Sequence, residues 1–124
     1  MFARLLDHLR EPFKTMVALA ALTGIRVGEL LALRWRAVDW DVGTLRIYEA
    51  VFEGQFQRPK SEKGVRTIPI GPLTRWLLEN HRQRLARLRP EDLIFPNRQA
   101  GPYRESNLLN RVPRPAGKAA GSDA

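Results

Sequence analysis

The spacing of apolar residues changes from a helical to a strand-like period about a third of the way along the chain, at Thr44. Before this point apolar residues recur at intervals of three and four, the pattern of an amphipathic helix. After it, Leu45 and Ile47 alternate with polar residues, as they do in a strand with one buried face. We therefore predict an α+β fold that is mostly helical, with a small antiparallel sheet of two or three hairpin-connected strands.

The same patterns, together with turn residues, predict where the elements lie. Helical spacing predicts helices over residues 1–10, 12–22, 27–36, 72–88 and 104–112. The second of these is apolar over most of its surface, so we expect it to be buried, and Gly24 should end it by adopting a left-handed conformation. Turn residues at 39–43, at Gly54 and at 61–64 separate the strand-like runs, and residues 91–102 are expected to form a connection with a short strand-like piece at 93–95.

Composition excludes several classes of protein and favours a polyanionic partner. The chain has no cysteine and two isolated histidines, so disulfide frameworks, thiol catalysis and a protein-held metal or cofactor are not expected. No apolar run is long enough to span a bilayer and no signal peptide is visible, which favours a cytoplasmic location. The net charge is +8 and arginine dominates it, which favours nucleic acid; a codon bias toward arginine would give a similar composition.

A second basic feature is a row of arginines at seven-residue spacing in the predicted helix over 72–88. Its members are Arg75, Arg82 and Arg89. A row of this kind is either a solvated helix face or a set of phosphate contacts, and the sequence leaves both open.

The most informative single residue is Arg26, which the pattern puts in the first turn of a helix. A cation is disfavoured there, because the helix start already carries partial positive charge. An arginine beside free backbone N–H groups makes a strong oxyanion site, suited to a phosphate. Glu29, three residues on, lies on the same face and can hold the guanidinium. The alternative is an exposed arginine with a chance partner.

The residues around Arg26 resemble a known family. The run Thr-Gly-x-Arg-x-x-Glu-Leu-Leu-x-Leu-x-Trp at 23–35, followed by Asp-x-Asp at 39–41, closely resembles the first active-site box of the tyrosine recombinases, the phage-integrase family. Residues 59–70 are similar to the family's β-hairpin that carries an active-site lysine, and residues 92–96 and 107–109 are similar to later segments. The resemblance implies a partial catalytic domain over residues 1–112. The residues at 113–124 are rich in Pro, Gly and Ala, so we expect them to form a disordered tail.

The resemblance also implies roles for individual residues. Arg26 would bind the scissile phosphate and stabilise the charge that develops on its oxygens. Lys60 would be the general acid, with Lys63 as its rival, and Glu29 would support Arg26 without reacting. Arg58, Lys63 and Arg66 would contact double-stranded DNA. No metal or cofactor is implied, and other recombinase protomers are candidate partners.

Part of the family pattern has no match. The His-x-x-Arg box and the nucleophilic tyrosine are not found, and neither Tyr48 nor Tyr103 has the setting of a nucleophile. We therefore expect binding without cleavage by this chain alone, and an exposed apolar patch at residues 30–35 or on the last helix. Two alternatives stay open: a non-catalytic DNA-binding module that regulates a full-length recombinase, and an unrelated small basic protein that binds structured RNA.

Overall fold

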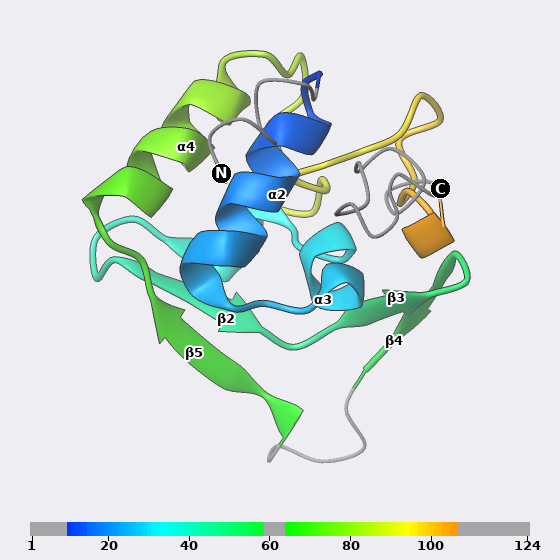
Figure 1. Cartoon of the computed structure of the whole chain (residues 1–124), viewed down its shortest axis with the longest axis horizontal. Coiled ribbons are helices and arrows are strands. Elements are labelled where there is room, and N and C mark those ends of the chain that lie inside the picture. The colour runs from blue at the N-terminus through cyan, green and yellow to red at the C-terminus, as the bar shows by residue number, and fades with distance from the viewer. Residues whose placement is uncertain (1–9, 59–63, 107–124) are drawn as a thin grey trace, which may run out of the picture.

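A computed structural model describes residues 10–58 and 64–106 of the 124-residue chain. It places helices on one side of a small antiparallel sheet, with a separate hairpin beyond the end of that sheet (Figure 1). This confirms the predicted α+β class. The helix expected at 1–10, nearly all of the one at 104–112 and the tail at 113–124 lie outside the described residues.

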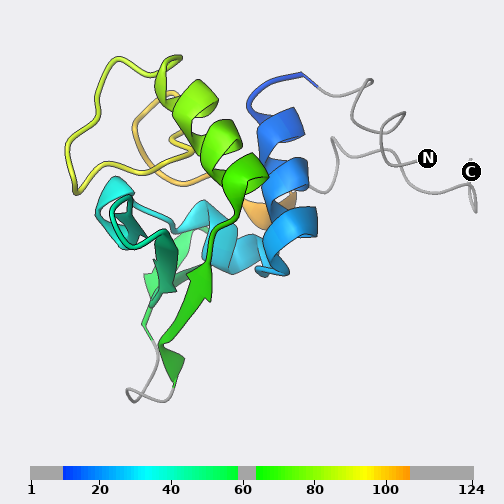
Figure 2. The same cartoon turned by 90° about the vertical axis from the view of Figure 1, so that its left-hand side faces the viewer.

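Two helices of equal length cover the sheet. They are α2 (Phe13–Thr23) and α4 (Pro72–Arg82), and they lie side by side (Figures 1 and 2). The Glu11 carboxylate accepts hydrogen bonds from the backbone N–H and the hydroxyl of Thr15, at 3.1 and 2.6 Å, and so satisfies a donor of the first turn of α2. Gly24 ends α2 with a φ of 72°, as predicted. The expectation that α2 is buried was too broad, because Leu22 at its end is 46% exposed.

The helix predicted over 27–36 is wrong in its length. α3 (Val27–Leu31) is a single turn and a half, and a 3-10 turn, η1 (Trp35–Ala37), follows after a break. The backbone at the break bonds to a distant segment: the N–H groups of Trp35 and Arg36 donate to the carbonyls of Asp92 and Pro90, and Ile94 N–H donates to the Leu33 carbonyl. These long-range bonds take the place of the next helical turn. The piece at 93–95 predicted to resemble a strand forms one isolated bridge, Arg34 with Leu93.

The helix predicted over 72–88 is also shorter than expected. After Arg82 the N–H groups of Gln83, Arg84 and Leu85 each donate to the carbonyl three residues back, so the helix tightens and ends. Arg89 lies beyond the helix and bonds to Asp92, so the arginines at 75, 82 and 89 do not form one stripe.

The strands form two sheets. The first has the order β1–β2–β5, and all pairs are antiparallel: β1 (Val38–Asp39), β2 (Thr44–Ile47) and β5 (Arg66–Pro69). The second is a hairpin of β3 (Ala50–Phe52) and β4 (Gln55–Gln57). Its turn places Glu53 and Gly54 at φ values of 50° and 81°, as a tight two-residue hairpin turn requires. The predicted sheet is confirmed, and the hairpin is an addition to it.

The core lies between the helices and the inner face of the three-stranded sheet. It includes Met16, Leu30, Leu31, Leu45, Ile47, Leu78, Ile94 and Phe95. The exposed apolar patch expected at 30–35 or on the last helix is not found at 30–35, because Leu30 to Leu33 and Trp35 are buried in this core. The last helix lies almost wholly outside the described residues. None of the helices among the described residues is long and apolar enough to cross a membrane.

A buried histidine ties the connection after α4 to the core. His81 Nε2 lies 2.5 Å from the Ile94 carbonyl oxygen, which can only accept, so Nε2 carries the proton. Nδ1 is then free to accept from Arg84, at 3.4 Å. Burial lowers the pKa of His81, and the charge of Arg84 lowers it further, against the opposing effects of Ile94 and Glu11. The ring is therefore held neutral and serves the fold.

Candidate phosphate-binding site at the start of α3

Arg26 stands immediately before α3 with an extended backbone, at φ −76° and ψ 153°. Its side chain is exposed, and among residues 10–58 and 64–106 it forms no ion pair with a carboxylate. A helix of five residues adds little dipole, so anion binding here would depend on the guanidinium itself. In the part of the chain that the structure describes, the guanidinium of Arg26 is thus open to solvent and outside ion-pair distance of any carboxylate.

Glu29 supports this position by a different contact from the one expected. Its Oε1 accepts from the backbone N–H of Arg26 at 3.1 Å, instead of holding the guanidinium. Arg66 on β5 donates from its two terminal nitrogens to the two Glu29 oxygens, at 2.7 and 2.9 Å. The carboxylate therefore fixes the backbone at the start of α3 to the sheet.

The charge on Glu29 follows from these contacts. Burial raises the pKa of this carboxyl, but the hydrogen bonds from Arg66 and from the Arg26 N–H, with the charges of both arginines, bring it below its ordinary value. The hydrogen bond to Glu29 in turn raises the pKa of Arg66. Arg66, a predicted DNA contact, is thus already engaged by a carboxylate.

The short α3 helix can approach the sheet only because residue 28 is glycine. A Cβ added at Gly28 would lie 2.6 Å from the backbone oxygen of Val51 in β3 and 3.0 Å from Oε1 of Glu105. The close approach of α3 and β3 sets the position from which Arg26 projects.

A second carboxylate, Glu49, lies between β2 and β3 and organises two arginines. Its side chain is buried, and its oxygens lie 3.2 Å from Nε of Arg34 and 3.8 Å from Nε of Arg58. Arg34 also donates to the Glu91 carbonyl at 2.7 Å and covers the Phe56 ring at 4.8 Å. Arg58, a predicted DNA contact, is thus held loosely by Glu49 while most of its side chain stays exposed.

A hollow of about 210 Å³ brings several of these groups together. It is lined by Glu29, Ile47, Tyr48, Glu49, Ala50, Gln57, Arg58 and Gly64. Arg58 and Gly64, the described residues on either side of 59–63, both line this hollow together with Glu29. Lys60 and Lys63, the two candidates for the general acid, lie outside the described residues.

Sequence reasoning missed Arg34 and Glu49. Arg34 occupies a variable position of the quoted motif, and Glu49 follows a strand pattern in which an acidic residue indicates exposure. Their pairing depends on the return of the chain at β3, which the spacing of apolar residues does not encode.

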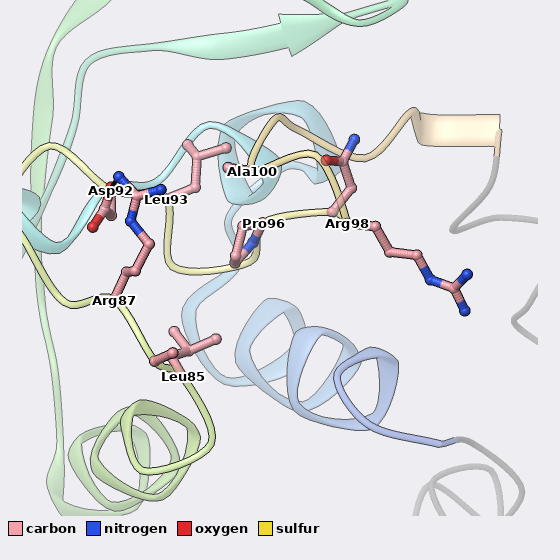
Figure 3. A pocket seen from close by; sticks show the side chains of 9 residues that line it. Leu85, Arg87, Asp92, Leu93, Pro96, Arg98 and Ala100 are labelled. Atoms are coloured by element: carbon pink, nitrogen blue, oxygen red, sulfur yellow. Dashed lines mark ion pairs between the residues drawn. The ribbon is translucent and has the colours of Figure 1, made fainter.

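Another hollow, of about 270 Å³, lies beside the connection that follows α4 (Figure 3). Arg87 and Asp92 meet at its rim, 3.9 Å apart, and Leu85 and Leu93 make part of its wall apolar, while Arg98 extends away from it. It shares no lining residue with the hollow at Glu29. Within the described ranges, no three His, Cys, Asp or Glu side chains are grouped so that they could hold a metal ion.

Solved structures with a similar arrangement of helices and strands include, by title, a transposon integrase and a recombinase. The integrase of transposon Tn1549, determined in complex with circular intermediate DNA, superposes with a TM-score of 0.71 at 14% identity, over 87% of this chain and 42% of that one. At this identity the match shows the fold alone.

Curated sequences extend the likeness. A protein named as a prophage phiRv2 integrase, from Mycobacterium tuberculosis, is 34% identical over 120 residues, which is 90% of this chain and 31% of that protein. The ICEBs1 integrase of Bacillus subtilis is 33% identical over 86 residues, covering 66% of this chain and 23% of the relative. The phage integrase family matches residues 2–124, and the chain belongs to this family. It spans less than a third of the length of these two relatives.

Proposed function

We propose that this chain is the part of a site-specific DNA recombinase that binds the scissile phosphate. The observation that carries the proposal is Arg26: the residues around it resemble the family's first box, and its guanidinium is exposed and forms no ion pair with a carboxylate among the described residues. A free guanidinium on a braced backbone suits the developing charge of phosphoryl transfer.

The remaining residues take supporting roles in this proposal. Glu29 and Arg66 hold the start of α3 against β5, and Arg58 contributes positive charge next to the site. Lys60 would protonate the leaving 5′ oxygen, and Lys63 is its rival for that role. The partner is double-stranded DNA, with other recombinase protomers assembled on the same site, and the location is the cytoplasm, where the chromosome is.

The two tyrosines of the chain have other contacts. Tyr48 accepts a hydrogen bond from Arg36 at 2.8 Å, and Tyr103 packs edge-on against Phe13 with ring centroids 5.4 Å apart. Neither is assigned the role of nucleophile, so the proposal for these residues is phosphate binding and not strand cleavage.

Binding of a fluorescent duplex, measured by anisotropy, tests the proposal. The chain should bind in the non-specific range, about 10⁻⁴ to 10⁻⁶ M at physiological salt, and should weaken steeply as salt rises. Arg26→Ala should lower the affinity by about 5- to 160-fold, the equivalent of one charge-assisted hydrogen bond of about 1 to 3 kcal/mol. Arg89→Ala is the matched control, because it removes one exposed arginine that is already paired with Asp92. Equal losses in the two variants would contradict the assignment of Arg26.

A nicked suicide substrate run on a denaturing gel tests the assignment of the tyrosines. No covalent protein–DNA band is expected from this chain. A band that disappears in Tyr103→Phe would show that Tyr103 is a nucleophile and would overturn that part of the proposal.

A further inference from the structure

The outer face of the three-stranded sheet, turned away from the helices, carries a second group of arginines. Leu45 and Ile47 of β2 are buried in the core, so Arg46 between them projects to the opposite face. The side chain of Arg36, from η1, lies beside that of Arg46 and lines the same hollow. Both guanidiniums lie against the ring of Tyr48, at 5.8 Å for Arg36 and 5.4 Å for Arg46.

Tyr48 fixes one of these arginines and leaves its anion-binding end free. Nε of Arg36 donates to the Tyr48 hydroxyl at 2.8 Å, while the two terminal nitrogens have no hydrogen-bond partner in the described part of the chain. That hydrogen bond raises the pKa of Arg36, so the side chain stays charged. The side chain of Arg46 makes no hydrogen bond or ion pair within residues 10–58 and 64–106, and its guanidinium lies against the Tyr48 ring.

Within residues 10–58 and 64–106, no carboxylate forms an ion pair with either arginine. The two carboxylates that act on Arg36 at longer range are Glu49 and Glu91. Glu49 is already paired with Arg34 and Arg58, and Glu91 with Arg89. Two like charges on one ring repel each other, and an anion that binds both relieves the repulsion.

The two arginines border a hollow of about 350 Å³, and a third arginine completes it. The lining residues are Arg36, Ala37, Arg46, Tyr48 and Arg58. Arg58 also lines the hollow at Glu29, so it stands between the outer face and the site at the start of α3. Arg58 and Tyr48, which line both hollows, therefore join the outer face to the hollow at Glu29.

We propose that Arg36, Arg46 and Arg58 form a second phosphate-binding site, which takes a backbone phosphate of duplex DNA. The planar fork of arginine matches phosphate oxygens, and an aromatic ring beneath it holds the fork without using its donors. The choice of ligand rests on the proposed function, because the DNA is the same duplex that Arg26 would contact. Contacts of this kind fix the position of a protein on DNA and carry no sequence information.

The salt dependence of duplex binding tests this site. Each phosphate contact contributes about 0.9 to the slope of log affinity against log salt concentration. Because this site takes one phosphate, the double variant Arg36→Gln/Arg46→Gln should lower the slope by about 0.9. The matched control is Arg87→Gln/Arg89→Gln, which removes the same charge from arginines already paired with Asp92 and Glu91. The control should lower the slope by less than about 0.5, and equal slopes in the two variants would overturn the second site. Thermal unfolding confirms that both variants remain folded.

Arg26→Gln in the same assay separates this inference from the proposed function. A slope lowered by Arg26→Gln but unchanged by the double variant overturns the second site alone. A slope lowered by the double variant but unchanged by Arg26→Gln supports the second site and contradicts the proposed function. A wild-type chain that does not bind duplex contradicts both.

Two further measurements test the ligand and the role of Tyr48. The Nε–H signals of Arg36 and Arg46 in NMR spectra should shift with a duplex more than with inorganic phosphate at the same phosphate concentration. Equal shifts would overturn the assignment to a DNA backbone. Tyr48→Phe keeps the ring and loses the hydroxyl, so it should weaken duplex binding by about two- to fivefold, in keeping with one neutral hydrogen bond. A Tyr48→Phe variant that binds like the wild type would contradict the positioning of Arg36 by the hydroxyl.

Discussion

The arginines around α3 and those on the outer face of the three-stranded sheet are held by different groups. Near α3, Arg66 and Arg34 are held by carboxylates, Glu29 and Glu49, which neutralise them. On the outer face, Arg36 and Arg46 are held by the ring of Tyr48, which leaves their charge available. The first arrangement joins distant segments of the fold, whereas the second serves to display positive charge. Substitutions near α3 should therefore lower stability, and substitutions on the outer face should lower only binding.

The largest effect on stability is expected at Glu49. Glu49→Ala leaves Arg34 without its carboxylate in a largely buried place, since only 21% of the Arg34 side chain is exposed. Removing one member of a buried ion pair destabilises by about 3 to 5 kcal/mol, and the exposure of Arg34 puts the expected loss at about 3 kcal/mol. Chemical denaturation measures it. Glu79→Ala, at an exposed position of α4, should change stability by less than about 0.5 kcal/mol. Equal losses of stability in the Glu49→Ala and Glu79→Ala variants would contradict the structural role of Glu49.

The next effect is expected at Gly28, where α3 touches β3. Gly28→Ala puts a methyl group 2.6 Å from a backbone oxygen, so the helix or the strand must move. Overpacking of this kind costs about 1 to 3 kcal/mol. Gly71→Ala is the control, because a Cβ there meets no atom within 4 Å and the φ is ordinary. A stable Gly28→Ala variant would show that α3 is not fixed against β3.

The contrast between the two regions also explains what the sequence could predict. The turn at 39–43, the left-handed Gly24 and the alternation in β2 are encoded by neighbouring residues, and all were confirmed. The break after α3 was not predicted, because it depends on backbone bonds to residues 90–94, more than 50 positions away. The helical spacing of apolar residues continues through the break, because apolar residues before it and after it are all buried in the core.

The site shows the same division between local and long-range information. The exposed arginine before α3 was visible in a local motif. Glu29 was expected to hold its guanidinium, but in the structure it accepts from the backbone N–H of Arg26. The ion pair between Glu29 and Arg66 was not predicted, because Arg66 reaches Glu29 from β5, 37 residues further along the chain. Likewise, the arginine pair on Tyr48 depends on η1 and β2 meeting in space, so neither residue was singled out beforehand.

A smaller effect is expected from the Glu29–Arg66 pair, and it should depend on pH. The pKa of Glu29 is lower in the folded chain, so its contribution to stability is present above the ordinary glutamate pKa, about 4.3, and is lost as the pH falls through the folded value. Arg66→Gln should lower stability at neutral pH by about 1 kcal/mol or less, because the Arg66 side chain is 44% exposed. The variant should also lose less stability than the wild type between neutral pH and pH 3. Parallel pH profiles would contradict the role of this pair.

The smallest effect on stability is expected from substitutions on the outer face of the three-stranded sheet. These substitutions test most directly whether the two groups of arginines differ in their role. Arg36 and Arg46 are exposed. In the described structure both side chains contact Tyr48, and neither forms an ion pair with a carboxylate. Removing both guanidiniums therefore breaks no ion pair and relieves the repulsion between them. Arg36→Gln/Arg46→Gln should change the free energy of unfolding by less than about 0.5 kcal/mol, the usual range for surface positions. Thermal and chemical denaturation at low salt measure the change, because low salt enlarges the effect of surface charge. A loss comparable with that of Glu49→Ala would mean that these arginines belong to the framework of the fold, and the distinction between the two regions would fail.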